Sequence, residues 1–288
     1  MAAQNLQASI VRKFIPTRKL TSRKGDNGKV LVVGGSYLYH GAPILSSIAA
    51  LRTGADLVYT CVPKINVQAT RAISPNLIVI PLVDSKLTRG AVNKLLGQIP
   101  NDLDSATIGM GLAVADKEAL NLLIKSLLDR DVRLSLDASA LVNYVLPLIP
   151  NKNVIVTPHA GEFKIMFGDT LPESKKERIS MVEKHAKANS ITILLKGATD
   201  IISDGKKTFL NTKKTPAMTV GGTGDVLSGI VSSMLSRNRN PLESSAAASF
   251  VNGMAARIVQ RKVGLHMVAS DLFDAIPIAL KPFDKIKQ

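Results

Sequence analysis

The sequence has one cysteine, few aromatic residues and no long apolar run, and each scarcity excludes a class of protein. A single cysteine among 288 residues excludes a disulfide framework and any metal centre that needs several cysteines of one chain. No apolar run approaches the roughly 18 residues that cross a bilayer, and the N-terminus lacks the apolar segment of a secretory signal. We therefore expect a cytoplasmic protein in a reducing compartment.

Acidic residues are scarce relative to basic ones. The 37 Lys and Arg residues exceed the 22 Asp and Glu residues, which gives a formal net charge of +15. This balance suits a nucleic-acid partner, an anionic surface, a small polyanionic ligand or simply a solvated basic surface. Because only 4% of the residues are aromatic and no nucleic-acid-binding motif is present, few side chains are available to stack on bases. We expect no nucleic-acid partner and no membrane partner.

From residue 30 onward, short apolar runs alternate with segments of helical periodicity. Strands are predicted at residues 30–33, 57–62, 76–82, 105–109, 133–137 and 154–157, and helices at 42–53, 116–128 and 140–148. Continuously apolar strands that alternate with helices are typical of an α/β fold, with a largely parallel sheet covered by helices on both faces.

The pattern changes near residue 191. Closely spaced strands at 191–195, 199–203 and 207–210, with an Asp-Gly turn at 204–205, predict antiparallel pairing. The last third is predicted to be helical, at 223–236, 241–261 and 270–280.

No repeat, low-complexity linker or break in composition divides the chain, so we expect one domain over residues 16–288. Residues 1–15 are set apart as a short basic leader. Seven basic residues and one acidic residue occur in residues 1–29: Arg12, Lys13, Arg18, Lys19, Arg23, Lys24, Lys29 and Asp26. Transit peptides are also basic, but the few serines and Pro16 argue against a long amphipathic targeting helix.

The strongest local motif is Gly-Gly-Thr-Gly-Asp at residues 221–225, directly before a predicted helix. Its glycines allow the backbone to approach a ligand closely, and the helix start directs free N–H groups and positive dipole at the loop. This combination binds phosphate. Because a carboxylate there would repel a resting phosphate, Asp225 is a candidate base beside a phosphoryl group in transfer. Alternatively, Thr223 or Asp225 only caps the helix.

Further candidate residues follow other predicted strands. Residues 157–162 read Thr-Pro-His-Ala-Gly-Glu, in which Glu162 would hold Mg²⁺ through water and His159 would hydrogen-bond a substrate. A structural role for His159 is the alternative. Lys196 and the Gly197 backbone, after another strand, would meet nucleotide phosphates, although the spacing is not that of a Walker A loop.

Glycine-marked turns also follow the strands at 30–33 and 105–109. Glycine turns at the C-terminal ends of parallel strands share one edge of a sheet, which is where open α/β sheets bind ligands. The first turn does not fit the G-x-G-x-x-G pattern of dinucleotide-binding folds.

Seven segments carry a family resemblance: 24–28 (KGDNG), 34–36 (GGS), 41–43 (GAP), 51–55 (LRTGA), 157–163 (TPHAGEF), 195–197 (LKG) and 221–227 (GGTGDVL). Together they resemble the NAD(P)H-hydrate dehydratase family, over about residues 16–280. The glycine–Asp motif is shared with the wider ribokinase-like superfamily, whereas the GGS…GAP and TPHAGE segments are more specific to the dehydratases. The resemblance implies a ribokinase-like fold.

The resemblance also implies an activity. Members of the family are carbon–oxygen lyases that repair NADH or NADPH whose nicotinamide ring has been hydrated. ADP or ATP, with Mg²⁺, phosphorylates the ring hydroxyl, and elimination of phosphate restores the double bond. A tetramer and a partner epimerase on a separate chain are implied as well. Two alternatives remain: a small-molecule kinase of the same superfamily, which would release a stable phosphorylated product, and a non-catalytic nucleotide- or nucleic-acid-binding protein.

Site residues are carried over by the same resemblance. Those implied to contact the hydrated dinucleotide are Ala42, Gly109, Gly111, His159 and Asp225. Those implied to contact the adenine nucleotide are Lys196, Gly197, Ala198, Thr199, Asp200, Gly221, Gly222, Thr223 and Gly224. Asp225 would be the catalytic residue, and Glu162 would place the metal.

The chain departs from the family pattern in three places. Met110 stands in a run that is usually Gly-Pro-Gly-Leu-Gly. Ser139 replaces a carboxylate, and Lys213 and Lys214 enter the loop before the glycine–Asp motif. These changes bear on substrate contacts more than on the class of reaction.

Overall fold

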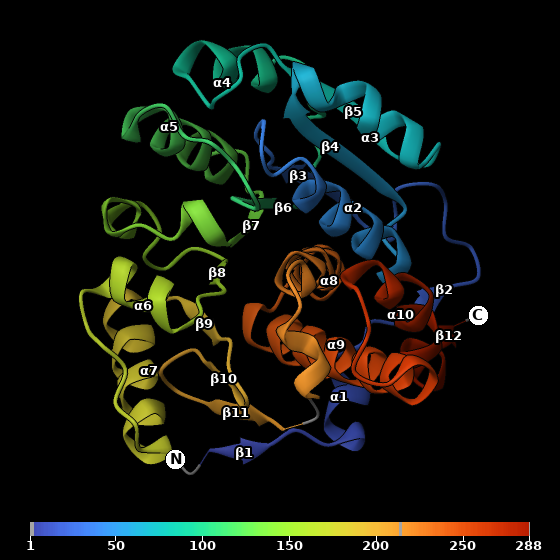
Figure 1. The fold of residues 1–288 in the computed structure, drawn as a ribbon, viewed down its shortest axis with the longest axis vertical. Helices are drawn as coiled ribbons and strands as arrows, with labels where there is room; N and C mark the ends of the chain where they lie inside the picture. Colours follow the sequence, from blue (N-terminus) through green and yellow to red (C-terminus); the bar gives the residue numbers. More distant parts are fainter. Residues whose placement is uncertain (1–2, 213–214, 288) are drawn as a thin grey trace.

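A ten-stranded sheet forms the centre of the molecule (Figure 1). The structure, a computed structural model, describes residues 3–212 and 215–287. In sheet order the strands are β1 (Gln4–Asn5), β11 (Thr208–Asn211), β10 (Asp200–Ser203), β9 (Thr192–Leu195), β8 (Val154–Val156), β7 (Arg133–Leu136), β6 (Ser105–Ile108), β3 (Lys29–Val33), β4 (Leu57–Pro63) and β5 (Ile78–Leu82). All pairings from β9 to β5 are parallel, and β10 is antiparallel to both of its neighbours. The predicted parallel sheet and the antiparallel strands after residue 191 are confirmed.

Helices cover both faces of the sheet, as predicted (Figure 1). One face carries α4 (Arg89–Leu96), α5 (Lys117–Leu128), α6 (Ala160–Phe167) and α7 (Lys175–Asn189). The other carries α1 (Ala8–Phe14), α2 (Gly41–Thr53), α8 (Thr223–Asn238), α9 (Pro241–Val263) and α10 (Leu272–Leu280). Beside β5 lies α3 (Val67–Ile73). A separate pair joins β2 (Arg18–Lys19) to β12 (Ile286–Lys287). The 3-10 helices are η1 (Lys64–Asn66), η2 (Ala138–Ala140), η3 (Asn143–Leu148), η4 (Pro216–Thr219), η5 (Ala269–Asp271) and η6 (Lys281–Phe283).

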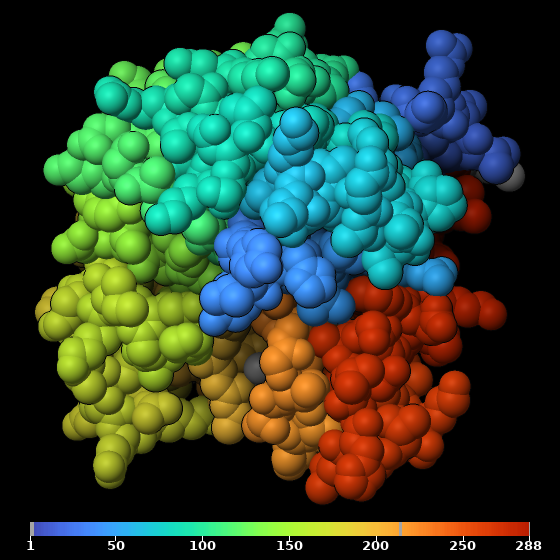
Figure 2. All heavy atoms as spheres, turned by 45° about the horizontal axis from the view of Figure 1, so that its top comes forward, coloured from blue at the N-terminus to red at the C-terminus, as the bar shows by residue number. Residues whose placement is uncertain are grey.

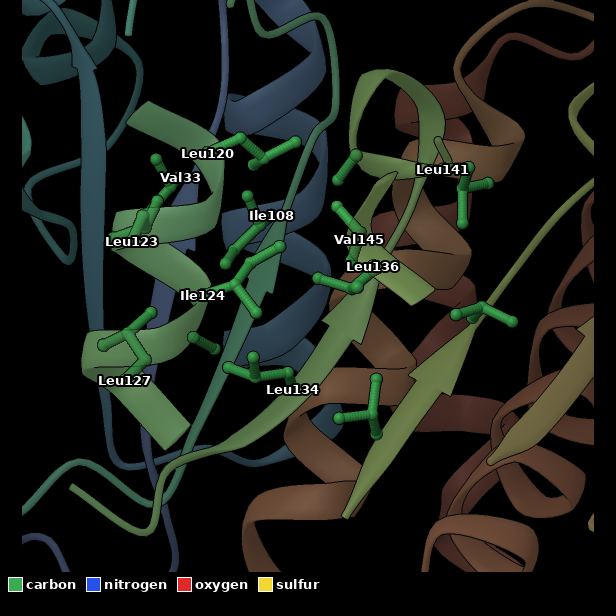
Figure 3. Close-up of a cluster of buried hydrophobic side chains, with 14 of the residues drawn as sticks. Val33, Ile108, Leu120, Leu123, Ile124, Leu127, Leu134, Leu136, Leu141 and Val145 are labelled. Atoms are coloured by element: carbon green, nitrogen blue, oxygen red, sulfur yellow. The ribbon is translucent and has the colours of Figure 1, made fainter. Parts of the chain in front are cut away.

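The packing of α5 shows how the local sequence builds the core. Asp116 caps the helix by accepting a hydrogen bond of 2.7 Å from the Ala119 N–H. Leu120, Leu123 and Leu127, at helical spacing, are fully buried against β6 and β7, as the close-up in Figure 3 shows. Burial of each such side chain stabilises the fold by about 1.5–3 kcal/mol.

Two expectations about local structure are corrected. Residues 140–148 do not form an α-helix but a 3-10 helix at Asn143–Leu148, because Pro147 lacks the N–H that an α-helix would need there. Residues 3–15, which the sequence set apart as part of a leader, pack against the rest of the fold. β1 pairs with β11, Val11 is fully buried, and the Phe14 and Phe209 ring centroids lie 5.5 Å apart. The boundary expected at residue 16 therefore does not separate two packed units.

The contact between α2 and α8 is very close at Gly229. A Cβ atom there would lie 2.0 Å from the carbonyl oxygen of Ser46 and 3.0 Å from the Ala49 side chain. Alanine would gain about 0.5–1 kcal/mol of helix propensity over glycine, but overpacking costs typically 1–3 kcal/mol and more where backbone must move.

We expect Gly229→Ala to lower the free energy of unfolding by about 2 kcal/mol, measured by urea titration. The matched control is Gly90→Ala in α4, where the nearest atom to the new Cβ is 4.0 Å away. That control should be neutral or stabilising. A Gly229→Ala protein as stable as the control would contradict this close packing.

Candidate active site

Two cavities meet at the C-terminal edge of the sheet, beside the start of α8. The first, named here the glycine-loop cavity, measures about 730 Å³, and the second, the Tyr39 cavity, about 650 Å³. The glycine-loop cavity is lined by His159, Lys196, Gly197, Ala198, Thr215, Pro216, Met218, Thr219, Val220, Gly221, Gly222, Thr223, Gly224, Leu227 and Asn252. The Tyr39 cavity is lined by Ser36, Tyr39, Ala42, Gly109, Gly111, Leu112, Ala113, Ala138, Ser139, His159, Glu162 and Asp225. Figure 2 shows the surface hollowed between the yellow and orange segments, below the blue loop that precedes α2.

The first turn of α8 faces the glycine-loop cavity. Gly222 precedes the helix with φ of +95°, a conformation that favours glycine, and no described side chain caps this helix start. Thr223 holds the loop by donating to the carbonyl of Met218 at 2.9 Å. The first N–H groups of the helix and its positive dipole end therefore face the cavity, as the sequence predicts for a phosphate site.

Asp225 lies in this first turn and lines the Tyr39 cavity. Its adjacent residue, Gly224, lines the glycine-loop cavity, so the carboxylate stands where the two cavities adjoin. Burial, together with the negative charges of Asp137 and Glu162, raises the pKa of Asp225 to about 7, against the opposing effect of Lys196. A base with a pKa near the operating pH is effective in proton transfer.

Lys196 forms a buried ion pair beside Asp225. Its Nζ lies 2.8 Å from Asp137 Oδ1 and 3.4 Å from Glu162 Oε2. Burial alone would lower the pKa of Lys196, but the two carboxylates raise it above its ordinary value. Conversely, burial alone would raise the pKa of Asp137, but Lys196 and the Ser228 hydroxyl lower it. The pair is therefore charged, and it holds the ammonium group next to Gly224.

Asp137 was not among the predicted site residues. Its signal is a carboxylate at the C-terminal end of a predicted strand, on the edge where the glycine turns cluster. Gly109 makes room for it: with φ of +124°, a Cβ at Gly109 would lie 1.8 Å from the Asp137 carbonyl oxygen. The turns after β6 and β7 therefore touch through backbone atoms.

His159 has the structural role that the sequence left open, and it also faces both cavities. Its Nδ1 accepts hydrogen bonds from the N–H groups of Gly161 at 3.0 Å and Glu162 at 3.3 Å, which caps α6. Glu162 Oε2 accepts from the His159 N–H at 2.8 Å in return. The ring remains 58% exposed, so substrate contact by His159 stays a prediction.

Glu162 is the predicted metal residue. One of its oxygens already caps α6 and lies near Lys196, and the described residues contain no group of three or more His, Cys, Asp or Glu side chains suited to a metal. Mg²⁺ commonly binds through one or two carboxylates together with substrate phosphates and water, rather than in an all-protein cage. The residues thus fit a Mg²⁺ ion held mainly by nucleotide phosphates, with Glu162 in a water-mediated role.

Most of the other predicted site residues line one of the two cavities. Ala42, Gly109 and Gly111 line the Tyr39 cavity. Gly197, Ala198, Gly221, Gly222, Thr223 and Gly224 line the glycine-loop cavity, whereas Thr199 and Asp200 do not. Asp200 instead accepts hydrogen bonds from the Gly197 N–H at 3.0 Å and from Ser249 at 2.6 Å, so it shapes the cavity wall from behind. The predictions missed Tyr39, whose sequence signal is an aromatic residue two positions before the Gly-Ala-Pro turn.

The departures from the family pattern have different structural settings. The Ser139 hydroxyl lies 2.8 Å from the carbonyl oxygens of both Gly109 and Leu112, and it fastens the turn after β6 by donating there. An ionised carboxylate could not donate in this way. Met110 is fully buried outside both cavity walls. Lys213 and Lys214 lie outside the described residues.

Comparison with known proteins places this site in a family. The family model described as NAD(P)H-hydrate dehydratase matches residues 30–278. The chain belongs to the NAD(P)H-hydrate dehydratase family. It is 69% identical to the ADP-dependent (S)-NAD(P)H-hydrate dehydratase of Nitrosopumilus maritimus, over 99% of this chain and 100% of the relative. It is 41% identical to the bifunctional NAD(P)H-hydrate repair enzyme of Pyrobaculum aerophilum, over 93% of this chain but 53% of that protein.

Solved structures of other proteins share this fold. The ADP/ATP-dependent NAD(P)H-hydrate dehydratase of Bacillus subtilis, co-crystallised with ATP and Mg²⁺, matches with a TM-score of 0.86 and 26% identity, over 99% of this chain and 100% of that one. Hydroxyethylthiazole kinase of Pyrococcus horikoshii matches with a TM-score of 0.63 and 13% identity, over 95% and 94%. The second likeness shows the fold alone, and the predicted ribokinase-like α/β architecture is confirmed. Among the described residues, no helix has the length and apolar character needed to cross a membrane.

Proposed function

We propose that this member of the dehydratase family restores hydrated NADH or NADPH, with ADP as the phosphoryl donor. The carrying observation is the placement of Asp225, a carboxylate with a pKa near 7, where two cavities adjoin. The glycine-loop cavity would take the nucleotide, since a helix start and Lys196 face its phosphate end. The Tyr39 cavity would take the hydrated nicotinamide ring. ADP is favoured because relatives at 69% and 62% identity are named ADP-dependent.

The first chemical step would be phosphoryl transfer. Asp225 removes the proton from the ring hydroxyl, the hydroxyl oxygen attacks the terminal phosphorus of ADP, and AMP leaves. The uncapped N–H groups at the start of α8 and the Lys196 ammonium stabilise the negative charge on the transferred group, a contribution that typically amounts to about 3–4 kcal/mol for one preorganised donor. Mg²⁺, with Glu162 holding one of its waters, would neutralise charge on the phosphates.

The second step would be elimination. The electron pair of the ring nitrogen expels the phosphate as the carbon–oxygen bond breaks, and the proton of the neighbouring ring carbon passes to the departing phosphate or to water, which re-forms the double bond. The substrate supplies the electronic push, so the protein needs to orient the ring and exclude water rather than to provide a further eliminating base.

The direct test is recovery of absorbance at 340 nm. We expect the protein with ADP and Mg²⁺ to restore this absorbance to hydrated NADH and to release AMP and phosphate in equal amounts. ATP in place of ADP is the comparison that defines the donor. A stable phosphorylated product without 340 nm recovery would identify a kinase instead, and no reaction with either nucleotide would contradict the proposal.

Several expectations remain outside these arguments. A homo-oligomer, specifically a tetramer, a partner epimerase on a separate chain, and a cytoplasmic location all stay predictions from the resemblance and the composition.

A further inference from the structure

A third cavity lies on the same edge of the sheet as the two cavities of the candidate active site. This cavity, named here the Tyr37 cavity, measures about 510 Å³ and is lined by Tyr37, Lys64, Ile65, Val83, Asp84 and Ser85. Its wall residues follow the C-terminal ends of β3, β4 and β5. Because those ends share one edge of a parallel sheet, the cavity extends the ligand-binding edge beyond β3. A volume of this size suits a small molecule.

The three cavities follow one another along this edge. The glycine-loop cavity lies after β8 and β9, where His159 and Lys196 line it, and the Tyr39 cavity extends from His159, after β8, to Ser36, after β3. The Tyr37 cavity continues over β3, β4 and β5. The Tyr39 cavity therefore lies between the other two.

Residues 36–39 form the boundary between the Tyr39 cavity and the Tyr37 cavity. Ser36 and Tyr39 line the first, whereas Tyr37 lines the second. Hydrogen bonds hold this segment in place: Asn66 Nδ2 donates to the Ser36 carbonyl at 2.9 Å, and the Tyr39 N–H donates to Ser36 Oγ at 3.2 Å. In Figure 2 the blue loop that precedes α2 lies between the hollow and the cyan segments. A ligand that extends from one cavity to the other would pass over this segment.

The proposed reaction leaves one half of its substrate without a place. A hydrated dinucleotide consists of two nucleotides joined through a diphosphate, and the Tyr39 cavity would take the nicotinamide half. ADP would occupy the glycine-loop cavity on one side, so the adenosine half has room on the other side, in the Tyr37 cavity. Two further cavities, at Asp56 and at Asn151, are lined by residues that precede β4 and β8, and so lie at the opposite edge of the sheet.

The walls of the Tyr37 cavity have the chemistry of a nucleoside site. Tyr37 and Ile65 are 72% and 61% exposed, so their apolar surfaces are accessible to a ligand. An aromatic ring stacks on the face of any base. Lys64 is also exposed, and an ammonium group pairs with phosphate. The Asp84 carboxylate accepts a hydrogen bond from the Thr88 hydroxyl, and it can accept from a ribose hydroxyl as well.

We propose that the Tyr37 cavity binds the adenosine half of the hydrated dinucleotide, with the adenine ring stacked on Tyr37. This inference rests on the proposed function. Ile65 and Val83 would pack against the base, and Lys64 would pair with the diphosphate. Binding of this remote half would hold the nicotinamide ring beside Asp225, so that its binding energy serves the orientation of the reacting hydroxyl.

The test compares a whole substrate with a truncated one. Hydrated NADH and hydrated reduced nicotinamide mononucleotide, which lacks the adenosine half, are each supplied with ADP and Mg²⁺, and kcat/KM is measured from 340 nm recovery. We expect wild type to prefer the dinucleotide. Tyr37→Ala should lower kcat/KM for hydrated NADH by about 5- to 150-fold, the range for loss of one base–aromatic stack. The value for the mononucleotide should not change.

Four further variants define the cause. Tyr37→Phe keeps the ring and should behave as wild type. Ile65→Ala, from the η1 wall, should lower kcat/KM for the dinucleotide alone, and Lys64→Gln should do so more at low salt than at high salt. The matched control is Leu38→Ala, because Leu38 is 74% exposed next to Tyr37 but lines none of the three cavities. It should leave both substrates unaffected.

Three results would overturn the assignment of the Tyr37 cavity while the proposed function stands. They are equal kcat/KM values for the two substrates in wild type, equal losses for both substrates in Tyr37→Ala, and no loss for either. A change in the oligomeric state of Tyr37→Ala, measured by light scattering, would assign the exposed ring to a contact between chains instead. Failure of wild type to restore either substrate would remove the proposed function, and this inference with it.

Discussion

Replacing Asp225 with asparagine is expected to lower turnover by about 10²- to 10⁴-fold, the range for loss of a general base. Asparagine has nearly the same shape but cannot accept the proton of the ring hydroxyl. ADP should bind at least as tightly as in wild type, since a negative charge beside the phosphates is removed. The measurements are 340 nm recovery and calorimetric titration with ADP. Normal turnover in the variant would contradict the assignment of Asp225 as the base.

The raised pKa of Asp225 also predicts a stability effect. In the folded protein this pKa is about 7, above the ordinary 3.8, so the folded state holds the proton more tightly than the unfolded state. The stability contributed by the protonated group is fully present below pH 3.8 and is lost as pH rises towards 7. Asparagine does not ionise, so Asp225→Asn should melt at a higher temperature than wild type at pH 8, by a margin that shrinks towards pH 4.

The control for this comparison is Asp274→Asn, because the Asp274 side chain is 86% exposed and forms a surface ion pair with Arg52. Exposed ion pairs contribute about 1 kcal/mol of stability at most. A lower melting temperature for Asp225→Asn than for wild type at pH 8 would contradict the prediction that the ionised Asp225 carboxylate destabilises the folded protein.

Wild-type turnover should fall as the pH drops below about 7, since Asp225 must be ionised to act as the base.

The sequence located the glycine loop that precedes α8 because its requirements are local. A glycine with positive φ directly before a helix, followed by a carboxylate in the first turn, can be read from residues 221–225 alone. The turns that follow parallel strands necessarily share one edge of the sheet, which also placed Gly109, His159 and Lys196 together. The same reasoning could not choose between capping and binding for His159, and the structure shows that its ring caps α6 while facing both cavities.

Other features depend on contacts between distant segments. Asp137 and Lys196 are 59 residues apart in sequence. Asp137 follows β7 and Lys196 follows β9, and only the sheet order, in which both strands flank β8, brings the two side chains into an ion pair. The α7 helix escaped prediction because only Val182 and Ala186 of its 15 residues are buried, which leaves no apolar periodicity to detect. Residues 1–15 are set apart in the sequence because the family resemblance begins near residue 16, yet Val11 and Phe14 pack in the core beside α9.

The ion pair between Lys196 and Asp137 provides the second large expected effect. Lys196→Met would leave the Asp137 carboxylate, only 3% exposed, without its cation. Breaking a buried pair from one side typically costs about 3–5 kcal/mol of stability. Turnover should be lost as well, because no ammonium group would remain beside Gly224 to stabilise the transferred phosphoryl group.

A double variant separates these two roles of Lys196. In Lys196→Met/Asp137→Asn the buried charge is gone from both partners, and the asparagine oxygen can still accept from Ser228, which bonds Asp137 in the wild type. Urea titration should therefore show most of the lost stability restored, whereas 340 nm recovery stays absent. The single variant Asp137→Asn should move the acidic limb of the pH–rate profile to lower pH, because one negative charge that raises the pKa of Asp225 is removed while the charge of Lys196 remains. Recovery of turnover in the double variant would mean that Lys196 serves only the fold, and the phosphoryl-stabilising role would then belong to the start of α8 alone.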